Sequence, residues 1–379
     1  MQTFDIKPYE MPAAARELRA QVRDIVSAHE HRFDPVRRAN CWVAIDPEFS
    51  RALGAAGLLG MTWPKEQGGH ERSALERYIV LEELLAAGAP VGAHWIADRQ
   101  TAPLLMRYGT AEQVDRWVPG VARGEVYACI GLSEPGAGSD LASVRSAARK
   151  DSEGWVLNGQ KVWTTGAHIA QIMIGLFRSE EGSERNAGLS QFLIPMDTPG
   201  ITVKPIIDLS GAHDFNEVFF DDVRLAEGAL VGKQGNGWAQ ATAELSLERS
   251  GPERYLSSHF LMTEFIRRLE VQSDAGALRL AGRMMSELWT LRQMSMAVAA
   301  RLAEGEDPAF EATMVKDLGN SFEQAIPQLI EQQLELDLSS EEILEMLVAY
   351  ELQVAPSFSL RGGTREILRG IIARGLGLR

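Results

Sequence analysis

Cysteine and histidine clusters are scarce in this chain of 379 residues, and each shortage excludes a kind of site. The two cysteines, Cys41 and Cys129, lie far apart, which excludes a disulfide framework and a cysteine-based zinc site. The same scarcity suits a reducing compartment, so we expect a cytoplasmic location. The seven histidines show no H-x-x-x-H spacing, and we therefore expect no metal site.

Positive charge and long apolar runs are also in short supply. The formal net charge is −14, which excludes a nucleic-acid partner because neutralising phosphates needs an excess of Lys and Arg. No uncharged apolar run approaches the roughly 20 residues that span a bilayer. The first residues lack the basic and apolar segments of a signal peptide, so we expect neither export nor a membrane span.

The chain divides into three regions by its residue patterns. Residues 1–123 read mainly as helices, with a capping box at Thr110-Ala-Glu-Gln113. Residues 124–232 show seven short apolar segments separated by turn signals, which predicts an antiparallel β-domain. Residues 233–379 return to helical periodicity, with a second capping box expected at Ser339-Ser-Glu-Glu342. The sequence therefore predicts an α+β fold with helical, β and helical domains in that order.

A polar loop at residues 132–140, Leu-Ser-Glu-Pro-Gly-Ala-Gly-Ser-Asp, follows the apolar segment 126–132, which reads as a buried strand. Pro135-Gly136 predicts a turn, and Gly138 is expected to take a positive φ. Glu134 and Asp140 are expected to accept hydrogen bonds from backbone N–H groups. Such a loop can bind a small polar group, although a plain turn remains the alternative.

A second informative stretch is residues 158–166, Asn-Gly-Gln-Lys-Val-Trp-Thr-Thr-Gly. A Trp and two Thr at the end of a strand place a flat π-surface beside hydroxyl groups. This combination suits a planar heterocycle, whereas the alternative is a core Trp among strand-forming Thr residues.

Together the two stretches resemble the acyl-CoA dehydrogenase family, in which a Ser-Glu-Pro-x-Ala-Gly-Ser-Asp loop and a later Trp-x-Thr segment hold FAD. The order of helical and β regions is similar as well, so the resemblance covers essentially the whole chain. It implies that Ser133 donates to the pyrimidine end of the flavin, that Trp163 lies against the isoalloxazine and that Thr165 bonds near N5. The residues that the resemblance assigns to the cofactor are Ile130, Leu132, Ser133, Trp163, Thr165 and Thr364. Those assigned to the acyl-CoA substrate are Ser139, Arg249 and Gly362.

The reaction implied by the resemblance is α,β-desaturation of an acyl-CoA thioester, in which a carboxylate removes the α-proton and hydride leaves the β-carbon. Many members of the family carry that carboxylate in a C-terminal Glu-Gly-Thr loop, but Gly362 stands at this position here. Other members place the base on the helix after a Gly-x-Gly turn, which points to Glu248 in this chain. An ordinary solvated Glu248 is the alternative reading, and Glu366 is the second candidate for the base.

Two segments that hold the ADP half of FAD in homotetrameric relatives are missing. No Arg-x-x-Phe-Gly match follows Pro252, and Gln353-Val-Ala-Pro-Ser-Phe358 replaces a glycine loop. The resemblance is therefore to heteromeric bacterial acyl-CoA dehydrogenases of sterol side chains, in which a paralogous subunit completes a heterotetramer. It implies a bulky or branched acyl-CoA substrate and an electron-transfer flavoprotein as acceptor. A non-catalytic structural subunit and an acyl-CoA oxidase remain the alternatives.

Overall fold

The computed structural model describes residue 4, residues 9–247, residues 251–271 and residues 274–378, and the side chains of residues 243–247 are left undescribed. It separates into two compact units. One unit contains residues 45–71 and 92–245 and includes the sheet, and we call it the β unit. The other contains residues 1–44, 72–91 and 246–379, and we call it the helical unit.

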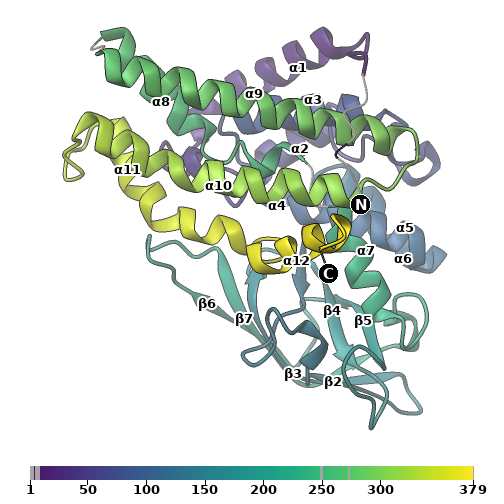
Figure 1. Cartoon of the computed structure of the whole chain (residues 1–379). Helices are drawn as coiled ribbons and strands as arrows, with labels where there is room; N and C mark the ends of the chain where they lie inside the picture. The colour runs from purple at the N-terminus through teal and green to yellow at the C-terminus, as the bar shows by residue number, and fades with distance from the viewer. Residues whose placement is uncertain (1–3, 5–8, 248–250, 272–273, 379) are drawn as a thin grey trace. The chain divides into compact units, whose positions relative to one another are not determined.

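The β unit is built on a curled sheet of seven strands (Figure 1). The strands are β1 (Ala128–Gly131), β2 (Ala147–Lys150), β3 (Trp155–Thr165), β4 (Ile172–Arg178), β5 (Leu189–Pro195), β6 (Ile201–Ile206) and β7 (Phe215–Leu225). Their order is β1-β4-β2-β3-β7-β6, with β5 paired to β4. The seven strands expected from the sequence are all present. The sheet is mixed rather than purely antiparallel, because β1 and β2 each pair with β4 in parallel.

Alternation along the strands places apolar side chains on both faces of this sheet. Ile172 and Ile174 on β4 pack with Leu104, Leu105 and other residues of the neighbouring helices. Met173, between them in sequence, joins an aromatic cluster on the opposite face. Both faces of β4 are therefore buried, which is why its sequence reads as a continuous apolar run.

Five helices belong wholly or mainly to the β unit: α2 (Pro47–Ala55), α4 (Gly92–Ile96), α5 (Ala102–Tyr108), α6 (Ala111–Ala122) and α7 (Gly237–Leu247). The capping box predicted at Thr110 is confirmed at the start of α6. Between α4 and α5 lies the π-helical turn η4 (Ala97–Thr101). Pro103 explains the π turn, because proline has no N–H for the i−4 carbonyl of Arg99 and its ring crowds that carbonyl.

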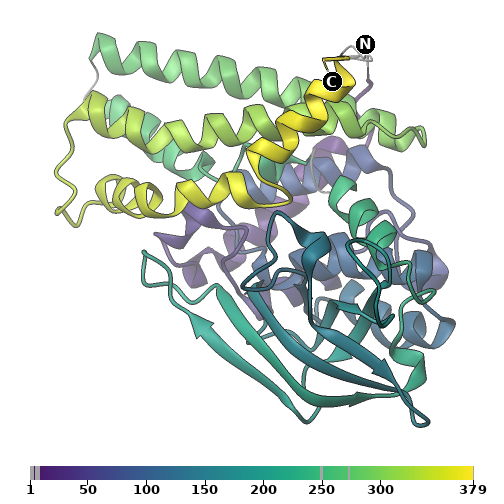
Figure 2. The same cartoon turned by 60° about the horizontal axis from the view of Figure 1, so that its bottom comes forward.

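The helical unit contains α1 (Ala15–His29), α3 (Ala74–Ala86), α8 (His259–Val271), α9 (Ala275–Ala303), α10 (Ala309–Leu334), α11 (Ile343–Val354) and α12 (Arg365–Gly375). The long helices α9 and α10 run side by side (Figures 1 and 2). Ion pairs also join α1, α3 and α9. The carboxylate of Glu82 on α3 accepts from Arg19 of α1 at 3.1 Å and from Arg292 of α9 at 2.5 Å.

The start of α11 differs from the sequence expectation. The helix begins at Ile343 with Glu342 as its N-cap and no side-chain cap bond, so the predicted capping box at residues 339–342 is wrong. The Ser339 hydroxyl instead donates to Asp337 at 2.7 Å in the preceding turn. Helix, strand and helix regions nonetheless follow one another as predicted, and the exact domain boundaries at 123/124 and 232/233 stay a prediction.

None of the described helices combines the length and the apolar character that crossing a membrane requires. The described residues also bring no three potential metal-ligating side chains together.

Candidate functional site

The polar loop at residues 132–140 contains the tight turn predicted at Pro135-Gly136. The backbone groups of Glu134 and Ala137 exchange two hydrogen bonds of 3.0 Å across it. Gly138 has no positive φ, so that expectation is wrong. A Cβ built on Gly136 or Gly138 would meet no heavy atom within 4 Å, and the outer side of the loop is therefore open to another molecule.

Glu134 anchors the loop from its inner side. Its carboxylate accepts from the backbone N–H of Arg145 at 2.7 Å and of Ser146 at 2.9 Å, as expected from the sequence. It also pairs with Lys161 at 2.7 Å, and the Lys161 side chain is completely buried. Burial opposes ionisation, but the lysine charge and these hydrogen bonds outweigh it and lower the pKa of Glu134. The loop is thus held by an ionised carboxylate with three donors.

Lys161 was not singled out from the sequence, although it occupies an inward-facing position of β3. Its Nζ also donates to the Leu132 carbonyl at 3.4 Å and lies 4.9 Å from the centre of the Phe177 ring. Burial lowers the pKa of Lys161 to about 8, while Glu134 acts in the opposite direction. A lysine at an inward position of an apolar strand is the signal that could have predicted a buried acid partner.

The two sequence motifs meet directly. The Val162 N–H donates to the Ser133 carbonyl at 2.9 Å, which sets Ser133 beside the residue that precedes Trp163. The same stretch of β3 therefore contacts three consecutive loop residues, Leu132, Ser133 and Glu134. The structure thus places Ser133 next to the segment that contains Trp163.

Trp163 has an unusual backbone conformation. Its φ is +58°, and the register of β3 against β7 shifts between Lys161 and Thr164. A bulky residue at positive φ is strained, and such strain concentrates at functional sites. The indole is 59% exposed and meets Phe215 edge-on, with ring centres 6.0 Å apart. The bulge thus turns a large aromatic side chain outward, which contradicts the core-Trp alternative.

The remaining cofactor and substrate candidates of the β unit lie around these two motifs. Ile130 is on β1, paired with Ile174 of β4. The hydroxyls of Ser133 and Thr165, both half-buried, have no hydrogen-bond partner within the described part of the chain and can bond another molecule. Ser139 is exposed at the far side of the loop. Asp140 accepts from the Ser143 hydroxyl and pairs with Arg185 at 3.4 Å, rather than capping backbone N–H groups with its carboxylate.

The other candidates belong to the helical unit. Gly362 and Gly363 have φ values of +62° and +105°, which favour glycine at both positions of the loop 361–364. The Gly363 carbonyl accepts from the buried Lys316 at 2.5 Å. Thr364 is the N-cap of α12. The pKa of Glu366 is lowered mainly by a hydrogen bond from its own backbone N–H and, to a smaller extent, by the Thr364 hydroxyl. Glu366 is fully exposed, so it lacks the burial that raises the pKa of a general base.

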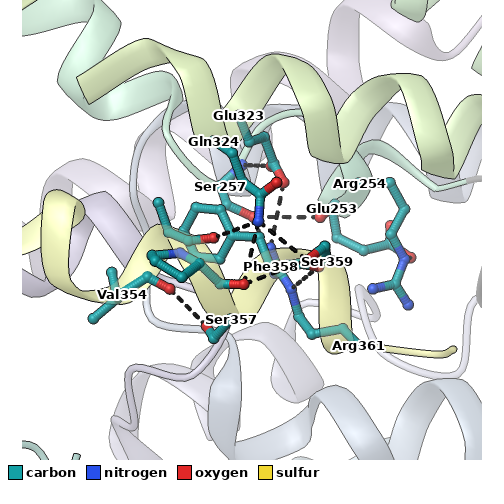
Figure 3. Close-up of polar contacts among 12 residues, drawn as sticks. Glu253, Arg254, Ser257, Glu323, Gln324, Val354, Ser357, Phe358, Ser359 and Arg361 are labelled. Carbon is teal, nitrogen blue, oxygen red and sulfur yellow. Dashed lines mark hydrogen bonds and ion pairs between the residues drawn. The ribbon is translucent and has the colours of Figure 1, made fainter. Parts of the chain in front are cut away.

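Arg361 anchors this second loop, as Figure 3 shows. Its guanidinium donates to the Ser257 hydroxyl at 3.2 Å and to Glu323 at 3.3 Å. It lies over the rings of Trp42 and Phe358, 4.4 and 4.3 Å from their centres. Burial lowers the pKa of Arg361 to about 10, yet the group stays charged at neutral pH. This cluster was not predicted from the sequence, because Glu323 and Ser257 lie 38 and 104 residues from Arg361 and only the fold brings them together.

Glu248 and Arg249, the candidates for the base and for substrate binding, lie outside the described residues. Their roles stay predictions from the sequence. The helix α7 that leads to them begins at Gly237, as the Gly-x-Gly turn predicts.

The place of the expected glycine loop is occupied by a packed 3-10 helix, η8 (Ala355–Leu360). Phe358 within it is completely buried. Gln324 of α10 donates to the carbonyls of Ala355 and Pro356 at 3.1 and 3.2 Å (Figure 3). This segment therefore packs against α10, and the missing ADP-binding loop stays a prediction from the sequence.

Comparisons with known proteins agree with this geometry. The family model described as "Acyl-CoA dehydrogenase, N-terminal domain" matches residues 12–125, and "Acyl-CoA dehydrogenase, middle domain" matches residues 129–223. The acyl-CoA dehydrogenase IpdE1 of Mycolicibacterium smegmatis is 36% identical over 349 residues, covering 87% of both chains. IpdE1 of Mycobacterium tuberculosis is 44% identical over 201 residues, which is 53% of this chain, and this match spans about half (52%) of that relative's length.

Two solved structures have the same fold over nearly the whole chain. The "Tcur3481-Tcur3483 steroid ACAD" has a TM-score of 0.86 at 26% identity and covers 99% of this chain and 98% of that chain. The ChsE4-ChsE5 complex from Mycobacterium tuberculosis has a TM-score of 0.84 at 28% identity and covers 98% and 100%. The predicted fold class is confirmed, and the chain belongs to the acyl-CoA dehydrogenase family of oxidoreductases.

Proposed function

We propose that this chain supplies the reactive half of an FAD site for the α,β-desaturation of an acyl-CoA thioester, as one subunit of a heteromer. The observation that carries the proposal is the contact between the two motifs. Lys161 and Val162 hold the loop so that the unpaired Ser133 hydroxyl lies next to the strained segment that exposes Trp163.

The residues of the β unit fit a flavin. Bound FAD would supply a hydride acceptor, and this chain would hold it with a flat indole surface and hydroxyl donors. Trp163 offers the surface, and Ser133 and Thr165 offer the donors, with Ile130 and Leu132 contributing backbone groups. A donor near the pyrimidine end stabilises the negative charge of a reduced flavin. Ser139, on the exposed side of the loop, is proposed to contact the CoA arm, and Thr364 is proposed as a further contact of the cofactor.

Glu248 is the proposed base for the α-proton. The position that carries the base in many relatives is Gly362, which has no side chain, and Glu366 has a lowered pKa. A carboxylate that removes a weakly acidic α-proton works better with a raised pKa, which Glu366 does not offer. Arg249 is proposed to bind the substrate, and Gly362 to leave room for it.

A paralogous subunit is proposed to supply the ADP-binding half. The glycine loop is replaced by the packed helix η8, and a pyrophosphate without its Arg partner would lose charge-assisted bonds of roughly 1.5–3 kcal/mol each. Two relatives of the same fold are named as two-chain assemblies, Tcur3481-Tcur3483 and ChsE4-ChsE5.

The helical unit exposes an apolar surface that would suit such a partner. Leu278, Met285 and Trp289 lie at i, i+7 and i+11 on α9, and they are 55%, 46% and 62% exposed. Leu318 of α10 is also exposed, beside a groove of about 540 Å³ between α9 and α10. We call these four side chains the α9 face and propose that the paralogous subunit covers it, because an apolar patch of this kind marks an interaction site.

The substrate is proposed to be a bulky or branched acyl-CoA of the sterol side-chain type, by analogy with the relative named a steroid ACAD. The proposed electron acceptor is an electron-transfer flavoprotein.

The proposal is tested by co-expressing the chain with a candidate paralogous subunit and presenting the complex with acyl-CoA thioesters of graded bulk. We expect reduction of electron-transfer flavoprotein, fastest with bulky substrates. Peroxide formation in place of that reduction would identify an oxidase. A complex that binds flavin but is inactive toward every thioester, with Glu248 intact, would contradict the catalytic assignment.

A further inference from the structure

A buried amide lies directly behind the strained segment of β3. Asn216 of β7 is completely buried, and its Nδ2 donates to the Thr164 carbonyl at 3.0 Å. The same Nδ2 lies 3.2 Å from His168 Nδ1, and Oδ1 lies 2.7 Å from His213 Nε2. Because a carbonyl oxygen only accepts, the Asn216 amide nitrogen must face Thr164. It follows that His213 carries its proton on Nε2 and that His168 accepts on an unprotonated Nδ1.

The two histidines are stacked. Their ring centres are 4.1 Å apart, with 25° between the planes. Two imidazolium charges at this separation repel, so the pair can hold one proton charge far more easily than two. The pair and Asn216 form one unit, which we call the His-Asn network.

This network is one of the contacts that hold the Trp163 segment. Trp163 is at positive φ inside the bulge, and residues in such conformations persist only where their surroundings fix them. On its C-terminal side, Thr164 and Thr165 pair with Asn216 and Phe215 of β7, and the Asn216 amide also donates to the Thr164 carbonyl. The Gly166 N–H donates to the Asp214 carbonyl at 3.0 Å, and the indole meets Phe215 edge-on.

The network also faces a cavity of about 570 Å³ in the β unit, so protons can reach it. The charged groups around the pair come from three elements: Arg116 of α6, Asp197 of the turn after β5, and Asp214, which precedes β7. The charge of Arg116 opposes a positive charge on the histidine pair, whereas the carboxylates of Asp197 and Asp214 favour it. The pair is therefore open to protons and surrounded by groups of both charge signs.

We propose that Asn216, His168 and His213 are positioning residues that hold the indole of Trp163 in place, and that protonation of His168 at Nδ1 releases it. Applied to the cofactor, this inference rests on the proposed function, in which Trp163 lies against the flavin. The claim that the network holds the Trp163 side chain does not depend on the proposed function.

The physical reason is a conflict of donors. A proton on His168 Nδ1 would face the Asn216 amide nitrogen, which also donates, so this hydrogen bond cannot persist. The amide must then turn away, which removes the donor of the buried Thr164 carbonyl. Burial and the nearby His213 lower the pKa of His168, so the release is expected below the ordinary histidine value of 6.5.

The test uses the fluorescence of the full chain without any flavin. The chain has eight tryptophans, so the Trp163 signal is the difference between the natural chain and Trp163→Phe. Acrylamide quenching of that difference is measured from about pH 8 to about pH 5, across the histidine range. We expect a step with a midpoint below 6.5, on the acid side of which quenching of Trp163 is stronger.

Three variants identify the source of the step. His168→Gln, which cannot be protonated but keeps an acceptor, should remove the step and leave quenching near pH 8 unchanged. Asn216→Ala should give the acid-side quenching at every pH. His31→Gln, at an exposed position of the helical unit, is the matched control and should keep the step.

Absence of a step in the natural chain, or a step that survives in His168→Gln, would overturn the proposal. If Asn216→Ala fails to fold, the His168→Gln comparison alone decides. A step in the chain without flavin, together with a complex that binds no FAD, would refute the proposed function and leave this inference standing.

Discussion

Two loops of the chain, residues 132–140 in the β unit and 361–364 in the helical unit, are each anchored by a buried carboxylate and a buried cation. Glu134 has three donors within 2.9 Å, and its pKa is lowered. Glu323 accepts from the Ser257 N–H at 2.7 Å and from Arg361 at 3.3 Å, and burial raises its pKa despite them. Burial opposes ionisation of both carboxylates, and the direction in which each pKa shifts depends on how far the nearby donors offset that burial.

The two loops also differ in what they offer a ligand. The first presents Ser133 beside Trp163, with a free hydroxyl and an exposed indole. The second has glycine at 362, where many relatives carry a carboxylate, and it is followed by a helix whose acid, Glu366, is solvated. The first loop thus offers the groups that the proposed cofactor site requires, whereas the second loop has an anchor of its own but no carboxylate at position 362.

The largest expected effect concerns Glu248, the proposed base. Glu248→Gln in the assembled complex should lower kcat by up to about 10⁴-fold, the upper range for general-base catalysis, while the visible flavin spectrum is kept. Glu244→Gln, one helical turn earlier, is the matched control and should retain activity. Steady-state reduction of electron-transfer flavoprotein measures both. Near-normal activity of Glu248→Gln would place the base elsewhere and reopen the comparison of the two loops.

Next in size is the loss of the cation that anchors the first loop. Lys161→Met leaves Glu134 buried without its countercharge, which should lower the free energy of unfolding by about 3–5 kcal/mol. Lys150→Met, on the adjacent strand β2, removes an exposed ion pair with Glu227 and should change the free energy of unfolding by less than about 1 kcal/mol. Urea unfolding of the two variants makes the comparison. An equal decrease in the free energy of unfolding in both variants would show that the buried pair stabilises the protein no more than the exposed pair does.

The two carboxylates should give opposite pH dependences of stability. Because the pKa of Glu134 is lowered, its contribution is present above the ordinary value of 4.5 and is lost as the pH falls through the folded-state pKa. Because the pKa of Glu323 is raised, its contribution is present below 4.5 and is lost as the pH rises through the folded-state pKa. Within the pH range over which each carboxylate titrates, the free energy of unfolding changes by up to about 1.4 kcal/mol per pH unit.

Glu134→Gln should therefore flatten the acid side of the stability profile, and Glu323→Gln the side above pH 4.5. Urea unfolding at a series of pH values separates the two. Slopes that change in the same direction in both variants would contradict the difference between the loops.

The smallest expected effect concerns the α9 face. Trp289→Glu should weaken binding of the paralogous subunit by about tenfold, which is about 1.4 kcal/mol, without changing the stability of the free chain. Arg279→Ala, at another exposed position of α9, is the control and should bind normally. Titration followed by analytical ultracentrifugation measures both. Unchanged binding by Trp289→Glu would remove α9 from the proposed interface.

Sequence reasoning captured the features that are local in the chain. The Pro135-Gly136 turn, the capping box at Thr110 and the seven strands follow from short patterns, and the structure confirms them. The positive φ expected at Gly138 occurs at Trp163 instead, because the bulge depends on pairing between β3 and β7 and not on local propensity.

The anchors of both loops could not be predicted for the same reason. Glu134 and Lys161 are 27 residues apart, and Glu323 and Arg361 are 38 apart. A single sequence does not show which buried acid meets which buried base, since only the fold brings them together. The parallel pairing of β1 and β2 with β4 was missed likewise, because strand patterns do not specify strand direction.

The most direct test of the half-site is the flavin content of the purified protein. The chain expressed alone and the chain co-expressed with its paralogue are purified in the presence of FAD, and bound flavin is counted per protein chain from the visible spectrum. We predict substoichiometric flavin on the solitary chain and one tightly bound FAD for each pair of unlike subunits. Stoichiometric, tightly bound FAD on the solitary chain would contradict the account.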